Sequence, residues 1–316
     1  MKCVDTARKP SAPSPATAAQ GAATPAAASL LVVGGAACLS ASAMFVKLAD
    51  INAGTAAFLR CAIAVLPLVP LMLLEQRRHG ALPRPLRGYA VLAGVFLGAD
   101  YVMWTLSILD IGAAVATVLI NVQVIVFPVL SRLFGGNRIP RRFLYATPFM
   151  LTGIALASGV LQGGRQSGNT VRGVALGMAA GVAYAAYLYL SRLSGQRSPQ
   201  HVVSPVCVST AAAAVASGLI ALLATGLPLA ISAAAWGWII ALALLGQVAA
   251  WILISKGSPR LAPNTAAALL LLQPVMAIGF ALLILHETPT LVQLCGCALV
   301  IASVWLAHRT PGTTNL

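Results

Sequence analysis

Two charged residues lie deep inside apolar stretches of this chain, and they are the side chains best placed to do chemistry. A charge at the centre of a membrane helix costs about 2.5–3.5 kcal/mol on insertion scales, so each one needs a specific reason. At about 1.5 Å of rise per residue, Arg60 lies roughly 9 Å and Asp100 roughly 13 Å from the same predicted membrane surface. We therefore expect both to face one polar cavity, where Arg60 pairs with Asp100. Either the pair is structural, or Asp100 takes up a coupling proton and Arg60 attracts an anionic substrate group.

Polar amides and aromatic rings occur near the same depth. Gln123, Gln247 and Gln273 lie near the predicted midplane, where such residues either hydrogen-bond neighbouring helices or line a binding site. Trp104 and Tyr184 are expected to supply flat walls for an amphipathic or aromatic substrate. These five residues complete the predicted binding or translocation site with Arg60 and Asp100.

Three further residues are candidates for gating or coupling. Lys47 lies close to the end of its apolar run, where its ammonium group either extends to the lipid headgroups or contacts a moving element. Pro274 removes a helix hydrogen bond and can hinge the helix or open it onto a cavity. Glu287 ends the same apolar run, where it is either a helix-end contact or part of a gate.

The composition defines the elements that must position these residues. The 316-residue chain is 59% hydrophobic and 8% charged, with a mean hydropathy of +0.90, which excludes a soluble globular protein. About 20 apolar residues are needed to cross a bilayer, and the sequence supplies such runs repeatedly. We predict an all-α integral membrane protein with ten transmembrane helices at 28–49, 53–74, 87–109, 111–133, 141–161, 171–193, 201–225, 234–255, 261–285 and 290–308. Residues 1–27 are expected to form a disordered tail and residues 309–316 a short C-terminal tail.

The basic residues predict the orientation of these spans. The formal charge of +14 would suggest nucleic acid in a soluble protein, but here we attribute it to loops and expect no nucleic-acid partner. With a cytoplasmic N-terminus, sixteen of the 20 Lys and Arg fall on the inner side. Only Arg165 and Arg172 fall outside, while Lys47 and Arg60 lie within spans. This positive-inside bias predicts that both termini are cytoplasmic and that the protein lies in the cell inner membrane.

The chain also repeats itself. An offset of about 150 residues aligns Gln123 with Gln273, and a similar offset aligns Asp100 with Gln247. Because five helices form each half, equivalent helices cross the membrane in opposite directions. Such inverted repeats are typical of secondary transporters, with the substrate near the midplane between the halves. The predicted domains are the two five-helix repeats, 28–161 and 170–308.

Three glycines at four-residue spacing, Gly173, Gly177 and Gly181, predict a close helix contact. The partner helix belongs either to this chain or to a second copy in a homodimer.

At this point the sequence resembles the drug/metabolite transporter superfamily, specifically the EamA-like transporters. The resemblance rests on the duplication, on the segment SAMFVKLADINAGTAAFLR (42–60) with Lys47 and Arg60, and on Gln273-Pro274 followed by Glu287. It covers about residues 28–308 and implies a carrier of metabolites or drugs, often an exporter.

The first half departs from this pattern, since Val124 matches Pro274 and Asn137 matches Glu287. The glutamine pair is therefore the stronger candidate for a site lining, and Glu287 the weaker one.

The expected function is secondary transport of a small metabolite, an amino-acid-like compound or a drug. The two five-helix halves would work by alternating access, in the direction of export. The expected partners are this substrate, the lipid bilayer and a proton or other coupling ion. A membrane scaffold and, less favoured, an intramembrane enzyme are the alternatives. No enzymatic activity, cofactor or metal is expected, because no HExxH motif, paired carboxylates or phosphate-binding glycine loop appears.

Overall fold

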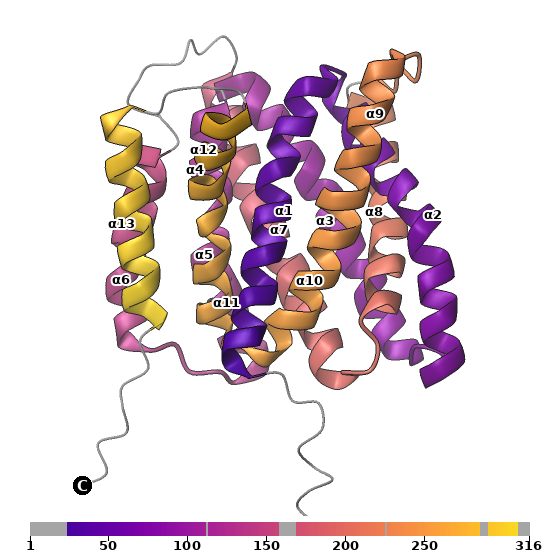
Figure 1. Ribbon diagram of the computed structural model, residues 1–316, viewed down its shortest axis with the longest axis horizontal. Coiled ribbons are helices and arrows are strands. Elements are labelled where there is room, and N and C mark those ends of the chain that lie inside the picture. Colours follow the sequence, from indigo (N-terminus) through magenta and orange to yellow (C-terminus); the bar gives the residue numbers. More distant parts are fainter. Residues whose placement is uncertain (1–23, 112, 158–168, 225, 285–289, 309–316) are drawn as a thin grey trace, which may run out of the picture.

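The computed structural model of the chain describes residues 24–111, 113–157, 169–224, 226–284 and 290–308. Throughout these ranges the regular elements are all helices and none is a strand, which confirms the all-α class. The elements stand side by side as one bundle, with α6 and α13 at one edge and α2 at the other (Figure 1). In order they are α1 Pro25–Ala49, α2 Ala53–His79, α3 Arg84–Ile111, α4 Ala113–Ile120, α5 Gln123–Gly135, α6 Arg141–Ala157, α7 Thr170–Arg197, α8 Val203–Ala224, α9 Ala233–Ala241, the π-helix η2 Leu242–Ala249, α10 Ala250–Gly257, the 3₁₀-helix η3 Ser258–Arg260, α11 Pro263–Leu270, α12 Leu272–Ile284 and α13 Leu291–His308.

The hairpin between α1 and α2 shows how local sequence ends one helix and starts the next. Asp50 adopts a left-handed conformation with φ 47°, and its N–H donates to the Val46 carbonyl, which stops α1. Asn52 then caps α2, because its side-chain oxygen accepts from Gly54 N at 2.9 Å and Thr55 N at 3.3 Å. This tight turn reverses the chain, so that α2 runs in the opposite direction to α1 and packs on α8 and η2 rather than on α1 (Figure 1).

Much of the bundle is suited to a bilayer. Eight described helical segments are long and apolar enough to cross a membrane, and Leu291–Leu306 is a shorter apolar helix. Helix α6 has 17 residues and is thus roughly 25 Å long, somewhat less than the ~30 Å of a hydrocarbon core. The protein is therefore a multi-pass membrane protein, while the count of ten crossings and the cytoplasmic placement of both termini stay predictions.

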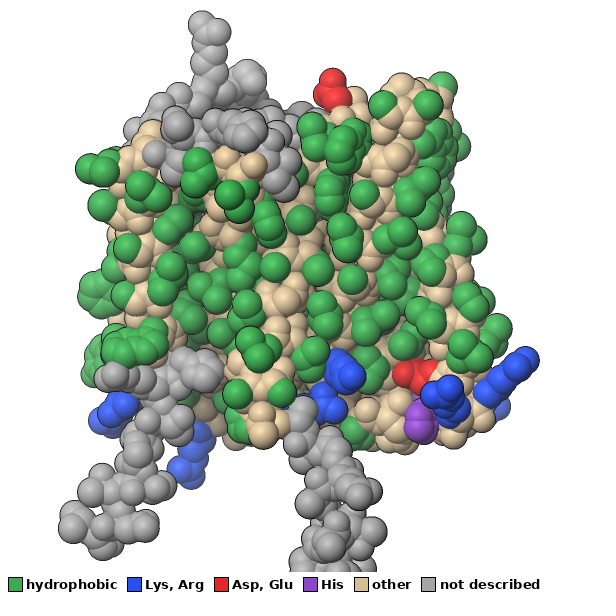
Figure 2. All heavy atoms as spheres, in the orientation of Figure 1, with side chains coloured by type: hydrophobic (Ala, Val, Ile, Leu, Met, Phe, Trp, Pro, Cys, Tyr) green, Lys and Arg blue, Asp and Glu red, His purple; other side chains and the backbone are tan. Residues whose placement is uncertain are grey.

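The Lys and Arg side chains on the visible face gather at one end of the bundle, below a broad belt of hydrophobic side chains (Figure 2). We call it the basic end. It holds the C-terminal turns of α2, α7 and α10, followed by η3, and its residues include Arg77, Arg78, Arg197, Lys256 and Arg260. The other end is called the opposite end.

The two segments that define the repeat are both broken helices, and they break at the same register. The chain turns between α4 and α5 and again between α11 and α12. Asn121 N donates to the Val118 carbonyl at 3.2 Å, and Leu271 N donates to the Ala268 carbonyl at 3.1 Å, which is the same contact 150 residues later. Pro274 accompanies only the second break, so a proline is not required for the first.

Helices of the two halves interdigitate through glycines. In α3, a Cβ atom on Gly94 would lie 2.1 Å from the Ser209 carbonyl oxygen, and one on Gly98 would lie 2.7 Å from the Ala213 carbonyl oxygen. Helix α8 therefore packs directly on the backbone of α3. In the same way Gly153 of α6 and Gly296 of α13 allow these two helices to meet at the edge of the bundle.

The glycine stripe of α7 makes its close contact within this chain. A Cβ on Gly173 would lie 2.7 Å from Asp110 Cβ, and one on Gly181 would lie 2.6 Å from the Ile120 carbonyl oxygen. The contact partners are thus α3 and α4. The stripe gives no support to a homodimer, which stays a prediction.

Candidate functional site: a charged cavity between the two halves

A cavity of about 240 Å³ lies where helices of both halves meet. Helices α1, α2, α3 and α4 line it from the first half, and α7, α10 and α12 from the second. The predicted site residues that line it are Arg60, Asp100, Trp104, Tyr184, Gln273 and Pro274.

Arg60 enters the cavity from α2 and is only 9% exposed. Its Nη2 donates to the Gly246 carbonyl at 3.0 Å, and its Cζ lies 4.3 Å from the centre of the Tyr101 ring. Gly246 belongs to η2, where the Ala250 N–H donates to the Leu245 carbonyl in the wider π-helical pattern. π-Helical turns are rare and frequently mark functional sites. The Nε of Arg60 has no hydrogen-bond partner.

Asp100 enters from α3 and is 3% exposed, and its Oδ1 has no hydrogen-bond partner. The expected pairing of Arg60 with Asp100 is not present, because neither a hydrogen bond nor an ion pair joins these two described side chains. The physical reason is that the Gly246 carbonyl and the Tyr101 ring hold the guanidinium group instead. Two buried charges of opposite sign therefore face one cavity without neutralising each other in direct contact.

Gln247 lies behind the cavity wall and is not among the residues that line it. It is fully buried, its Oε1 accepts from Tyr101 Oη at 2.8 Å, and its Nε2 donates to Thr210 Oγ1 at 3.3 Å. Trp251 Nε1 lies 3.3 Å from both Gln247 Oε1 and Tyr101 Oη. Gln247 thus positions the Tyr101 ring, on whose face the Arg60 guanidinium group lies.

Of the predicted pair of glutamines, only Gln273 lines the cavity, and its backbone carbonyl accepts from Ser40 Oγ at 2.9 Å. Gln123 is 1% exposed, does not line the cavity, and its Oε1 has no hydrogen-bond partner.

Of the predicted gating residues, Pro274 lies in the cavity wall. Lys47 lies in α1, but its side chain is not described, and Glu287 lies outside the described residues.

Tyr101, Ser40 and Ser42 are among the lining residues that sequence reasoning missed. The repeat does not single out Tyr101, because the offset that aligns Asp100 with Gln247 aligns Tyr101 with Val248, an apolar residue. The two serines did leave a weak signal, because they are hydroxyl groups in an otherwise apolar span. Each bonds back to its own helix, at the Ala36 and Cys38 carbonyls.

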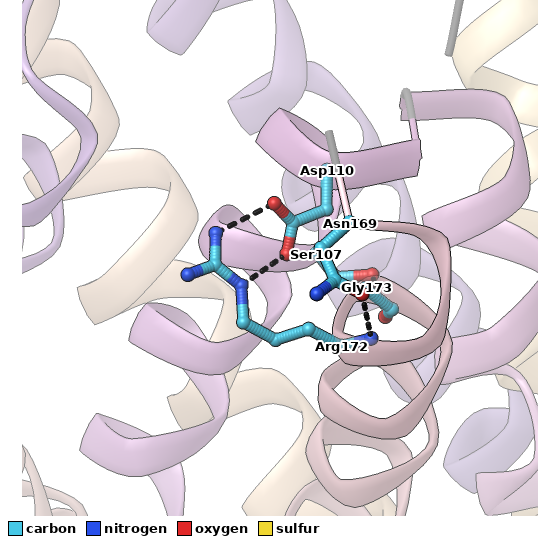
Figure 3. A network of polar contacts seen from close by, with 5 residues as sticks. All are labelled: Ser107, Asp110, Asn169, Arg172 and Gly173. Atoms are coloured by element: carbon cyan, nitrogen blue, oxygen red, sulfur yellow. Dashed lines mark hydrogen bonds and ion pairs between the residues drawn. The ribbon is translucent and has the colours of Figure 1, made fainter. Parts of the chain in front are cut away.

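At the opposite end, an ion pair joins α3 of the first half to α7 of the second (Figure 3). Arg172 Nε and Nη2 each donate to one oxygen of the Asp110 carboxylate at 2.7 Å. Beside them, Ser107 Oγ donates to the Gly173 carbonyl at 2.8 Å, and Arg172 N donates to Asn169 Oδ1 at 3.0 Å. We call Asp110 and Arg172 the acidic clasp.

The acidic clasp is expected to make thermal stability depend on pH. The hydrogen bonds from Arg172 hold the pKa of the Asp110 carboxyl below its ordinary value. Since the folded-state pKa is lowered, the clasp stabilises fully above the ordinary aspartate pKa of about 4 and is lost as the pH falls through the lowered value. At neutral pH, wild type should therefore have a higher Tm than Arg172→Gln. The margin should be small because the Arg172 side chain is 62% exposed and solvent-exposed charges contribute little, and it should vanish in acid. Asp110→Asn should follow Arg172→Gln, and parallel curves for all three proteins would show that the clasp contributes nothing.

At the basic end, a second contact joins α2 to α8. The Glu75 carboxylate accepts from the backbone N of Val202, Val203 and Ser204 at 2.7–2.8 Å and from Ser204 Oγ at 2.6 Å. A carboxylate here satisfies the free N–H groups at the start of α8 and complements the positive end of its dipole. We call Glu75 and the start of α8 the helix-cap clasp. Sequence reasoning missed this contact because Glu75 lies just after a predicted span and just before Arg77 and Arg78, where a charged residue is typical of a loop.

The arrangement defines a class of protein: a helical membrane protein whose two intercalated halves line a largely apolar cavity that contains two charged side chains. The EamA-like transporter family model matches the chain twice, over residues 26–159 and 171–309. The chain therefore belongs to the EamA-like transporter family, a family of small-molecule membrane transporters, and carries two copies of its repeat.

Solved structures support the fold. Twenty-nine chains match, and one of them, a crystal structure described only as that of a protein, has a TM-score of 0.75 at 16% identity. The match covers 90% of this chain and 98% of the other. Such low identity shows the fold alone. No curated protein sequence matches.

Proposed function

We propose that the protein is a secondary transporter that exports a small metabolite by alternating access, with the cavity as its substrate site. The observation that carries this proposal is the pair of buried charges, Arg60 and Asp100, which face a space between the two halves without contacting each other. Burying charge without a partner is costly, so a purely structural role would favour their pairing or replacement by apolar residues. A substrate that enters the cavity gives both charges a partner.

The two clasps are the proposed gates. The acidic clasp and the helix-cap clasp lie at opposite ends of the bundle, and each joins a first-half helix to a second-half helix. In alternating access, one clasp opens while the other stays closed, so that the cavity communicates with one side of the membrane at a time.

Coupling to a proton is part of the proposal, with Asp100 taking up the proton when the substrate has left.

The topology completes the proposal. We propose ten crossings, with α6 and α13 added to the eight long segments, because these two short helices pack on each other through Gly153 and Gly296. The concentration of Lys and Arg at the basic end supports a cytoplasmic position for that end, with the protein in the inner membrane. The two repeats are proposed as the domains 28–161 and 170–308, flanked by tails.

A comparison of metabolite pools tests the proposed function. Cells with and without overexpressed protein are extracted, and small molecules are measured inside the cells and in the medium. We expect at least one compound to fall inside the cells and to rise outside. A matched strain expressing Asp100→Asn should lose this change or alter its pH dependence. Unchanged pools of every small molecule would instead favour the membrane scaffold.

A further inference from the structure

We propose that the connection between α5 and α6 binds the headgroup of an anionic phospholipid, whose acyl chains lie along the exposed apolar surface of α6. This inference is separate from the proposed transport and uses only the placement of the chain in a membrane.

The first support is a cluster of exposed arginines. Arg132 lies in the last turn of α5, Arg138 in the connection, and Arg141 and Arg142 in the first turn of α6. We call these four residues the arginine cluster, and all four are exposed. Basic residues grouped directly beside a membrane helix attract anionic lipids, with a gain in affinity of about fivefold for each residue near the surface.

The acidic residues that the structure describes lie elsewhere. Glu75 holds the start of α8, and Asp110 pairs with Arg172. Asp100 lines the cavity, and Asp50 lies in the turn before α2, at the opposite end. Within the described residues the arginine cluster therefore has no acidic counterpart, and it is available to an anion from outside the chain.

The connection is tied down at both of its ends, so the arginine cluster has a defined place. Asn137 N and Nδ2 both donate to the Ser131 carbonyl of α5, at 3.3 and 3.2 Å. Phe143 N donates to the Pro140 carbonyl at 3.0 Å, which starts α6. Arg138 lies between these two anchors. In Figure 1 the connection runs along the lower end of the bundle, which is the basic end.

The exposed face of α6 passes directly from charge to apolar surface. Arg141, Leu144, Tyr145 and Phe149 follow one another at spacings of one to four residues that place them on one face of the helix. Leu144 is 55%, Tyr145 71% and Phe149 55% exposed. A phospholipid has the same order along its length, since a charged phosphate is followed by acyl chains. Tyr145 lies where the two meet, as aromatic residues at membrane interfaces do.

Helix α5 approaches the connection in the same way. Ile125, Val129 and Leu133 recur every four residues and are 38%, 39% and 70% exposed. Arg132 lies beside them in the last turn. Two exposed apolar stripes therefore end at the arginine cluster. A soluble anion would contact the arginines alone, whereas a phospholipid covers both the charge and the apolar surface.

The fold itself does not require these arginines. The offset of 150 residues that relates the two repeats aligns Arg141 with Leu291, at the start of α13. There, Thr290 N donates to Gln293 Oε1 at 2.9 Å, and Gln293 N donates to Thr290 Oγ1 at 3.4 Å. The equivalent helix thus starts with uncharged side chains, so the positive charge at the start of α6 is a feature of one side of the membrane only.

Thermal shifts of the purified full-length protein in mixed micelles test this inference. The protein is titrated with dioleoylphosphatidylglycerol, with dioleoylphosphatidylcholine, which has the same acyl chains and no net charge, and with glycerol phosphate, a soluble phosphate monoester. We expect the phosphatidylglycerol to raise Tm at a mole fraction at least tenfold lower than the phosphatidylcholine. Glycerol phosphate should have little effect, because it lacks the acyl chains.

A matched pair of double variants locates the site. Arg141→Gln/Arg142→Gln removes two adjacent arginines from the cluster, and Arg77→Gln/Arg78→Gln removes two adjacent exposed arginines from α2, at the other edge of the basic end. At about fivefold for each arginine, the first variant should need a roughly 25-fold higher mole fraction of phosphatidylglycerol for half of the shift. The second should need less than threefold more.

A milder pair gives the same comparison if a double variant folds poorly. Arg138→Gln should weaken the phosphatidylglycerol effect about fivefold, and Arg78→Gln should leave it nearly unchanged.

The inference is overturned if the two lipids act alike, if glycerol phosphate alone gives the full shift, or if the variants of α2 and of α6 lose the effect equally. None of these outcomes bears on export, which the metabolite comparison tests by itself.

Discussion

Replacing Arg60 with Gln is expected to lower the transport rate about 100-fold while leaving the protein folded. A hydrogen bond to a charged group contributes about 1.5–3 kcal/mol, and every 1.4 kcal/mol is a factor of ten in binding, so loss of the guanidinium group removes one to two orders of magnitude. The glutamine amide can still donate to the Gly246 carbonyl, and the cost of burying the Arg60 charge disappears. We therefore expect Tm to change little. Initial rates of export from preloaded cells, normalised to protein level, provide the measurement.

Arg197 offers a matched control. Its Cζ lies 5.2 Å from the centre of the Tyr89 ring and its Nη1 donates to Tyr89 Oη at 3.2 Å, so it repeats the arginine-on-tyrosine contact at the basic end, away from the cavity. Arg197→Gln should change the transport rate less than twofold. Equal losses in the two variants would mean that the Arg60 contact matters for structure alone.

Replacing Gly94 with Ala is expected to destabilise the protein strongly. The added Cβ would lie 2.1 Å from the Ser209 carbonyl oxygen and 2.7 Å from Ala212 Cβ, so α3 and α8 must separate. Overpacking of a core typically costs about 1–3 kcal/mol, and a clash with backbone cannot be relieved by rotation of a side chain. We expect a Tm lower by several degrees in detergent and a reduced yield of folded protein.

Gly88 of the same helix is the control for this substitution. No atom lies within 4 Å of the position of its Cβ, and alanine favours a helix over glycine by about 1 kcal/mol. Gly88→Ala should therefore leave Tm unchanged or raise it. If Gly94→Ala were as stable as Gly88→Ala, the close packing of the two halves along α3 and α8 would be wrong.

The helical elements could be predicted because a bilayer constrains the sequence strongly. Every backbone polar group in hydrocarbon must be satisfied internally, so long apolar runs indicate helices, and the run that begins near Arg84 became α3. The break beside Pro274 was also predictable from the missing N–H of proline. The break at Asn121 was not, because no residue type there enforces it.

Sequence reasoning brought Arg60 and Asp100 to one cavity but did not predict their contacts. Counting residues along each helix placed Arg60 and Asp100 at similar depth, and both line the cavity. Their pairing failed because the competing partner of Arg60 is the carbonyl of Gly246 in a π-helical turn, and a backbone acceptor has no signature in the sequence. Gln123 does not line the cavity, since depth does not specify which way a side chain faces when its helix is broken nearby.

Transport by the purified protein alone is the most direct test of whether the cavity is the substrate site of a transporter. Proteoliposomes containing wild type or Arg60→Gln are loaded with the compound identified in the metabolite comparison, and entry of the labelled compound by exchange is followed over time. We expect exchange in wild type and a rate about 100-fold lower in Arg60→Gln, because loss of the charged contact weakens substrate binding by up to two factors of ten. No exchange in wild type, or equal exchange in both proteins, would contradict the assignment of the cavity between the two halves as the substrate site of a transporter.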